Sequence, residues 1–132
     1  MRDFSDVDIK FYERGYFGAP EGNFTCADEL ITRIWNAGIE TFRSCAEDAV
    51  IDNPTRERGE WTGDVVGAGM NICSVAYGDM RIIRRGLTHA TWCAAPDGCV
   101  AGLCPGGVEH VSTYALQWVN ACVEYYRMTG DR

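Results

Sequence analysis

Charged and aromatic residues gather in one short stretch of this chain, IDNPTRERGEWTGD at positions 51–64. Its carboxylates are Asp52, Glu57 and Asp64. Cleavage of a glycosidic bond requires a carboxylic acid that protonates the leaving oxygen, and further carboxylates can accept hydrogen bonds from sugar hydroxyls. These residue types are therefore compatible with a sugar-cleaving site. A solvated loop is the alternative interpretation, because a run of charges is usually a solvated surface.

The chemistry depends on the protonation of these carboxyl groups. A general acid has to keep its proton near neutral pH, which requires a raised pKa. Burial and neighbouring anions raise the pKa of a carboxyl group, whereas arginines such as Arg56 and Arg58 lower it. Asp64 falls in the first turn of a predicted helix, where the helix dipole favours negative charge. We therefore expect Asp64 to be ionised and to accept hydrogen bonds.

Trp61 and Arg56 complete the candidate site. An indole ring can pack on the C–H face of a sugar, and its N–H can donate to a hydroxyl. Each residue also has an ordinary structural explanation. Trp61 could belong to the core, Asp64 could only start a helix, and Arg56 with Glu57 could be a solvated pair worth less than about 1 kcal/mol.

Four helices are predicted, and the charged stretch connects the first two. The first follows Thr25–Asp28, which resembles a capping box, and its apolar residues recur at three- and four-residue steps until about Ala49. Pro54 ends it, because the residue before a proline disfavours helix. The second helix starts near Thr62 or Gly63 and is apolar on most sides. Such a helix needs neighbours on several sides.

The third and fourth predicted helices are amphipathic, and residues 96–107 between them read as a glycine-rich loop. The third places apolar residues on one side and three arginines, Arg81, Arg84 and Arg85, on the wet side. The fourth runs from about Ser112 to Thr129, and Gly130 is a natural stop. Its apolar stripe consists of Leu116, Val119, Val123 and Tyr126.

The N-terminal residues follow a different pattern. Apolar and polar residues alternate from Asp6 to Phe11, which is typical of a short strand. Everything after residue 23 looks helical, so this strand has no partner in the chain. The orphan strand and the apolar second helix together indicate a piece of a larger fold.

The composition is that of one globular domain, with 132 residues, 46% hydrophobic and 23% charged. The net charge of −7 disfavours nucleic acid as a partner, and no apolar run is long enough to span a membrane. Without an export signal, the seven cysteines are predicted to be reduced thiols in a cytoplasmic protein. A zinc site is a further alternative, although the spacing of its candidate ligands is unlike a zinc motif. Those ligands are Cys93, Cys99, Cys104 and His110.

The charged stretch DNPTRERGEWTGD resembles the D-x-P-x-R-E-R-x-x-W-x-G-D signature of the inverting α-L-rhamnosidases. The flanking segments GNFTCADELITRIWNAGIET and WVNACVEYYRMTGDR are also similar to helices of that family. The resemblance implies an all-α fold, a partial (α/α)6 six-hairpin barrel of about four helices preceded by a short strand. Residues 1–20 would be the end of a β-rich region and a linker, and residues 21–132 the N-terminal portion of the catalytic domain.

The resemblance also implies roles for the site residues. Glu57 would be the general acid, Asp52 and Asp64 would bind sugar hydroxyls, and Arg56 and Trp61 would line the same pocket. It implies a rhamnose-containing glycoside as substrate and no metal or organic cofactor. The family's general base would lie outside this chain, so we expect the chain alone to be inactive.

Several expectations about partners and alternative functions accompany this assignment. Exposed apolar helix faces would contact the rest of the catalytic domain or a second copy of the chain. A six-hairpin hydrolase with another glycan substrate and a non-catalytic helical interaction module are the alternative functions.

Overall fold

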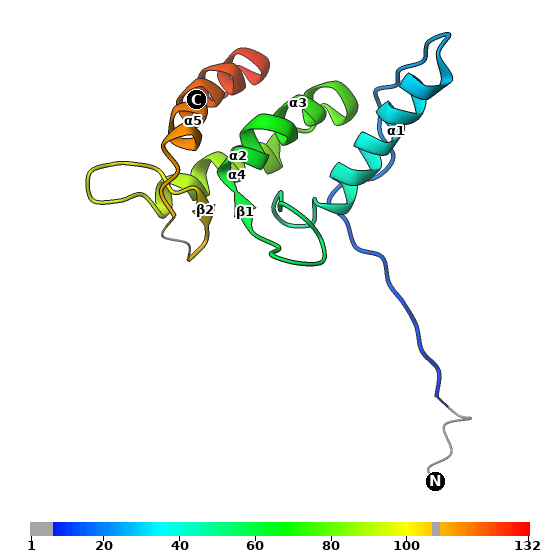
Figure 1. Ribbon diagram of the computed structural model, residues 1–132, viewed down its shortest axis with the longest axis horizontal. Helices are drawn as coiled ribbons and strands as arrows, with labels where there is room; N and C mark the ends of the chain where they lie inside the picture. Colours follow the sequence, from blue (N-terminus) through cyan, green and yellow to red (C-terminus); the bar gives the residue numbers. More distant parts are fainter. Residues whose placement is uncertain (1–6, 107–108) are drawn as a thin grey trace.

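The computed structural model describes residues 7–106 and 109–132, and it is mostly helical, as predicted (Figure 1). The longest helices are α1 (Glu29–Ser44), α4 (Arg81–Trp92) and α5 (Ser112–Thr129). Between α1 and α4 a continuous helical segment combines α-helical and π-helical turns: α2 (Thr62–Asp64), η1 (Val65–Gly69), α3 (Met70–Ile72) and η2 (Cys73–Tyr77). No helix in the described ranges is long and apolar enough to cross a membrane.

Helix α1 is shorter at both ends than the sequence pattern predicts. Its N-cap is Asp28, whose side chain accepts a hydrogen bond from the backbone N–H of Leu30 at 2.8 Å. This bond satisfies a free donor of the first turn, so the cap lies at Asp28 rather than Thr25. At the other end, the chain leaves the helix after Ser44 and forms an isolated antiparallel bridge between Ala46 and Val50. The bridge turns the chain toward Asp52.

The helical segment from Thr62 to Tyr77 begins where it was predicted and supplies much of the core. Val65 and Cys73 are almost fully buried, and they belong to the same cluster as Ile82 and Ile83 of α4. Gly78 ends the segment in the left-handed conformation, with a φ of 68°. Glycine adopts this conformation without the steric cost that a side chain would add.

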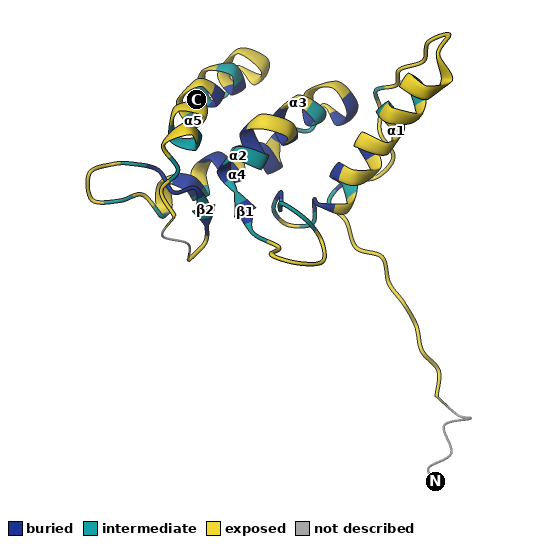
Figure 2. Cartoon of the chain, in the orientation of Figure 1, coloured by how far each residue is buried: buried dark blue, intermediate teal, exposed yellow. Residues whose placement is uncertain are grey.

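Helices α4 and α5 have the predicted positions, but their apolar residues differ in burial. On α4 the apolar side packs into the core, and the three arginines face solvent as expected. On α5 the core receives Ala121 and Tyr125 instead, and the predicted stripe remains exposed (Figure 2). The spacing of apolar residues correctly identifies this apolar face of α5. Among the described residues, however, none covers it. The exposed stripe is Leu116, Val119, Val123 and Tyr126.

The predicted N-terminal strand is wrong for residues 7–11, which form no strand in the structure. Phe11 is 93% exposed. A strand requires a neighbour for its backbone groups, and no described residue pairs with this segment. Asp6 lies outside the described residues.

A small sheet forms elsewhere. Strand β1 (Glu60–Trp61) pairs antiparallel with β2 (Leu103–Cys104), with Glu60 opposite Cys104. The predicted loop at residues 96–107 therefore contains a strand, and Gly107 lies outside the described residues. The pairing attaches the second half of the charged stretch to the loop that precedes α5 (Figure 1).

Candidate active site

Asp52 closes the charged stretch into a loop. Its backbone N–H donates to the carbonyl oxygen of Gly59 at 2.9 Å, and its carboxylate Oδ1 accepts from the Gly59 N–H at 2.9 Å. Oδ2 accepts from Asn53 Nδ2 at 2.7 Å. The carboxylate therefore holds both ends of residues 52–59 while it remains half-buried.

The turn within this loop is fixed by local hydrogen bonds. Asn53 Oδ1 accepts from the backbone N–H groups of Thr55 at 3.1 Å and Arg56 at 2.6 Å. Arg58 has a φ of 53°, the left-handed region, and its guanidinium donates to the carbonyl oxygen of Pro54 at 2.9 Å. A side chain in this conformation costs about 1–2 kcal/mol, so the surrounding bonds must hold it in place.

Glu57 lies on the exposed side of the loop, together with the arginine and tryptophan predicted to accompany it. Its Oε2 accepts from Trp61 Nε1 at 3.2 Å, and its Oε1 is 2.7 Å from Arg56 Nη2. The Glu57 side chain is 39% exposed, so its carboxyl group is accessible to a ligand. We call Arg56, Glu57 and Trp61 the outer group.

Asp52 and Asp64 form a separate group and line one cavity of about 270 Å³. We call them the inner pair. The cavity lies between α1 and the helical segment that starts at Thr62, and apolar side chains such as Phe42 and Ile72 form much of its wall. Two carboxylates in a largely apolar cavity provide hydrogen-bond acceptors for a neutral polar ligand.

The pKa of Asp64 shifts in the direction opposite to the one expected from the helix dipole. Burial raises the pKa of the Asp64 carboxyl, and the negative charge of Asp52 raises it further. The helix dipole was expected to shift this pKa downward. Desolvation and the like charge of Asp52 outweigh the dipole, because both disfavour the ionised form.

The five predicted residues are thus divided between two neighbouring groups. The structure brings Asp52 together with Asp64, and Glu57 together with Arg56 and Trp61. Glu57 does not line the cavity of the inner pair. The loop closed by Asp52 and Gly59 connects the two groups.

Tyr114, in the first turn of α5, is a site residue that the sequence did not indicate. Its ring lies edge-on to Trp61, with centroids 6.3 Å apart and planes at 79°. A Cβ at Gly63 would come within 2.4 Å of Tyr114 Cε1. The glycine of the W-x-G-D motif therefore makes room for the tyrosine, a relation between distant residues that no local pattern reveals.

The alternative metal site receives no support from the described residues, among which no group of three or more potential metal ligands is found. The seven cysteines are free thiols. Burial raises the pKa of the Cys104 thiol to about 12, and Cys104 Sγ donates to the carbonyl oxygen of His89 at 3.3 Å.

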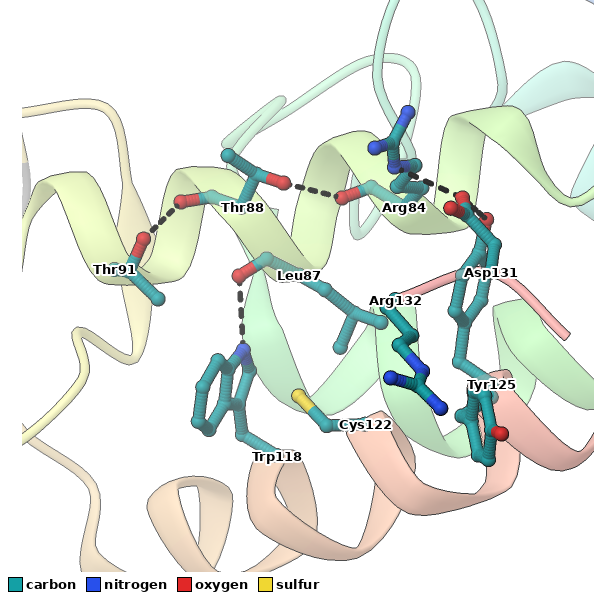
Figure 3. A pocket seen from close by; sticks show the side chains of 10 residues that line it. Arg84, Leu87, Thr88, Thr91, Trp118, Cys122, Tyr125, Asp131 and Arg132 are labelled. Carbon is teal, nitrogen blue, oxygen red and sulfur yellow. Dashed lines mark hydrogen bonds and ion pairs between the residues drawn. The ribbon is translucent and has the colours of Figure 1, made fainter.

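A second hollow, of about 550 Å³, lies between α4 and α5 (Figure 3). Its polar groups already bond to one another: Trp118 Nε1 donates to the carbonyl oxygen of Leu87 at 2.9 Å, and Arg84 pairs with Asp131 at 3.1 Å. None of the five predicted residues lines it. It is therefore separate from the candidate site.

Comparison with known proteins assigns the chain to a family. Residues 19–132 match the family model of the bacterial alpha-L-rhamnosidase 6 hairpin glycosidase domain. The chain belongs to this family. The resemblance found in the charged stretch is thereby confirmed, and with it the assignment to a glycosidase domain.

A solved structure supports the fold. The rhamnosidase from Klebsiella oxytoca with rhamnose bound superposes with a TM-score of 0.73 at 22% sequence identity. The match covers 86% of this chain and 23% of that chain. The partial six-hairpin fold is therefore confirmed, and the chain spans about a quarter of the rhamnosidase chain it matches. A search of curated proteins gave no match.

Proposed function

We propose that this chain is the N-terminal part of a catalytic domain that removes terminal α-L-rhamnose from a glycoside with inversion of configuration. The observation that supports this most strongly is the placement of Glu57. Its exposed carboxyl group is held by the Trp61 N–H and by Arg56, on the loop that Asp52 of the inner pair closes. The family assignment supplies the class of reaction.

In the proposed mechanism, Glu57 is the general acid. It protonates the glycosidic oxygen as the bond to the aglycone breaks, while water attacks the anomeric carbon from the opposite face. Asp52 and Asp64, which line the inner cavity, accept hydrogen bonds from sugar hydroxyls, and Arg56 and Trp61 contact the sugar beside Glu57. No metal or organic cofactor takes part in these steps.

The general base lies outside this chain in this proposal. An inverting mechanism uses two carboxyl groups roughly 6.5–9.5 Å apart with a water molecule between them. We expect the remainder of the catalytic domain to supply the second carboxylate and to pack on the exposed apolar faces of α5 and α1, where Leu116 and Ile34 are 73% and 61% exposed. Self-association through these faces is the alternative.

Two experiments test the proposed function. The complete enzyme is assayed against aryl glycosides of rhamnose and of other hexoses, with NMR of the first product formed. We expect selective release of rhamnose as the inverted β-anomer. Selectivity for another sugar would instead favour a six-hairpin hydrolase with a different glycan substrate, and release of the α-anomer would contradict inversion.

The second experiment uses the purified 132-residue chain with an aryl rhamnoside. We expect no rhamnose to be released, because the base is missing. Detectable release would refute the proposed division of the two carboxyl groups between this chain and the rest of the domain.

A non-catalytic helical interaction module is the second candidate function, favoured by the exposed stripe of α5. It predicts that the chain folds cooperatively, binds a partner through α5 and has no affinity for rhamnose. A rhamnose titration followed by NMR separates the two, since our proposal expects shifts at the inner pair.

A further inference from the structure

Glu60 is a buried carboxylate that the proposed mechanism does not use. Its residue is 5% exposed, and its Oε2 lies 2.7 Å from Nδ1 of His89 on α4. Its Oε1 has no hydrogen-bond partner among the residues that the structure describes. Arg85 Nε donates to His89 Nε2 at 3.4 Å, which leaves Nδ1 as the protonated nitrogen and makes His89 the donor to Glu60.

Such a pair is a weak source of stability. Replacing both partners of a buried hydrogen bond with apolar groups of similar shape can be nearly neutral or stabilising. Burial of a carboxylate oxygen without a partner adds a further cost. A role in orienting the neighbouring side chains would explain why this pair occupies a core position.

Strand β1 sets the direction in which the Trp61 side chain points. Successive side chains of a strand point to opposite faces, so the inward bond of Glu60 turns Trp61 outward. Thr62 extends the attachment, since its N–H donates to the carbonyl oxygen of Gly102 at 2.8 Å and its Oγ1 to that of Ala101 at 2.7 Å. The Trp61 indole then lies over Gly59, where an added Cβ would be 3.1 Å from Nε1.

We propose that Glu60 and His89 form a positioning pair that fixes strand β1 so that the Trp61 indole N–H stays on the carboxylate of Glu57. Neither residue touches the substrate. The catalytic consequence rests on the proposed function of Glu57, whereas the positioning of Trp61 can be measured without any activity.

The test uses NMR of the indole N–H groups in the 132-residue chain, with a Trp61→Phe variant to assign the Trp61 signal. The double variant Glu60→Leu with His89→Leu keeps side chains that fill the core. It removes the hydrogen bond between Glu60 and His89. We expect the Trp61 N–H to exchange with water about tenfold faster, as for loss of one hydrogen bond. In Glu60→Gln the amide oxygen still accepts from His89, so we expect exchange close to that of the unmodified chain.

The control is Val100→Ala. Val100 belongs to the small cluster around Ala90, Ala101 and Cys104, so this variant loosens the core without touching the positioning pair. Unchanged Trp61 exchange in the double variant would overturn the proposal, and so would an equal acceleration in the control. If the double variant does not fold, His89→Leu alone, which also removes the bond to Glu60, is judged by the same outcomes.

Kinetics of the complete enzyme then separate this inference from the proposed function. We expect the double variant to lower kcat about tenfold or more with little change in KM, and Glu60→Gln to restore it. Faster Trp61 exchange in an enzyme that hydrolyses no rhamnoside would contradict only the function. An active rhamnosidase with an unmoved Trp61 would contradict only the positioning pair.

Discussion

The inner pair and the outer group belong to one short stretch of sequence, residues 52–64, but are held in different ways. Asp52 is half-buried and bonds to the backbone of Gly59, and Asp64 shares its apolar cavity. Glu57 is more exposed, and among the described residues it bonds to the side chains of Trp61 and Arg56. The difference indicates that Asp52 maintains the loop, whereas the Glu57 carboxyl group is the more accessible one. Stability and activity should therefore respond differently to changes in the two groups.

The largest expected effect is on catalysis by the outer group. Glu57→Gln in the complete enzyme should lower kcat by about 10²- to 10⁴-fold, because it removes general acid catalysis. The melting temperature should change little, since the side chain makes no backbone bond. Steady-state kinetics and thermal melts check both expectations, and Glu109→Gln, an exposed change outside the charged loop, is the matched control.

The next effect concerns the stability of the inner pair. Asp52→Ala should lower the free energy of unfolding by about 1–3 kcal/mol, because the Gly59 N–H loses a charged acceptor. Glu57→Ala should cost less than about 0.5 kcal/mol, as is usual for an exposed residue. Urea unfolding of the two variants measures the contrast. Equal losses would remove the distinction between the inner pair and the outer group.

A smaller effect is expected from the backbone conformation of Arg58, in the loop that joins the two groups. Arg58→Gly and Arg58→Ala remove the same bond to the Pro54 carbonyl, but only glycine relieves the left-handed φ of 53°. We expect the glycine variant to be more stable than the alanine variant by about 1 kcal/mol. An alanine variant as stable as the glycine variant would show that the conformation carries no strain.

The smallest expected effect is a pH dependence from Asp64. Its pKa is raised in the folded chain, so its contribution to stability is present below the unfolded pKa of about 4 and is lost as the pH rises through the folded pKa. Asp64→Asn removes this loss. The melting temperature of the variant relative to the unmodified chain should therefore rise between pH 4 and pH 7.

Comparing the Asp64→Asn variant with the unmodified chain at each pH cancels the opposite contribution of Asp79. Arg81 beside it lowers the pKa of Asp79 to about 2, and this pair is present in both. A difference in melting temperature that is constant with pH would mean that Asp64 titrates normally.

Short sequence motifs were sufficient to predict much of the fold. The motif W-T-G-D placed the start of the second helical segment, and Gly130 placed the end of α5. The five residues that the family motif indicated lie in two groups near one loop, and their roles stay a prediction. These features depend on residues that are close together in the sequence.

Features that depend on distant residues could not be predicted in this way. His89 meets Glu60 and Tyr114 meets Trp61 only after the helices pack. Alternation alone predicted a strand at residues 7–11, where no pairing partner is described, and missed β1, whose partner is β2. The direction of the Asp64 pKa was likewise decided by burial, which the position in the helix does not reveal.

The central claim, that Glu57 donates the proton to the leaving group, is tested most directly by varying the leaving group in the Glu57→Gln enzyme. A phenol of low pKa departs without protonation, whereas an alcohol requires it. We predict that the substitution slows cleavage of rhamnosides with poor leaving groups far more than cleavage of those with good ones. An equal loss of rate for both substrates would contradict the assignment of Glu57 as the acid.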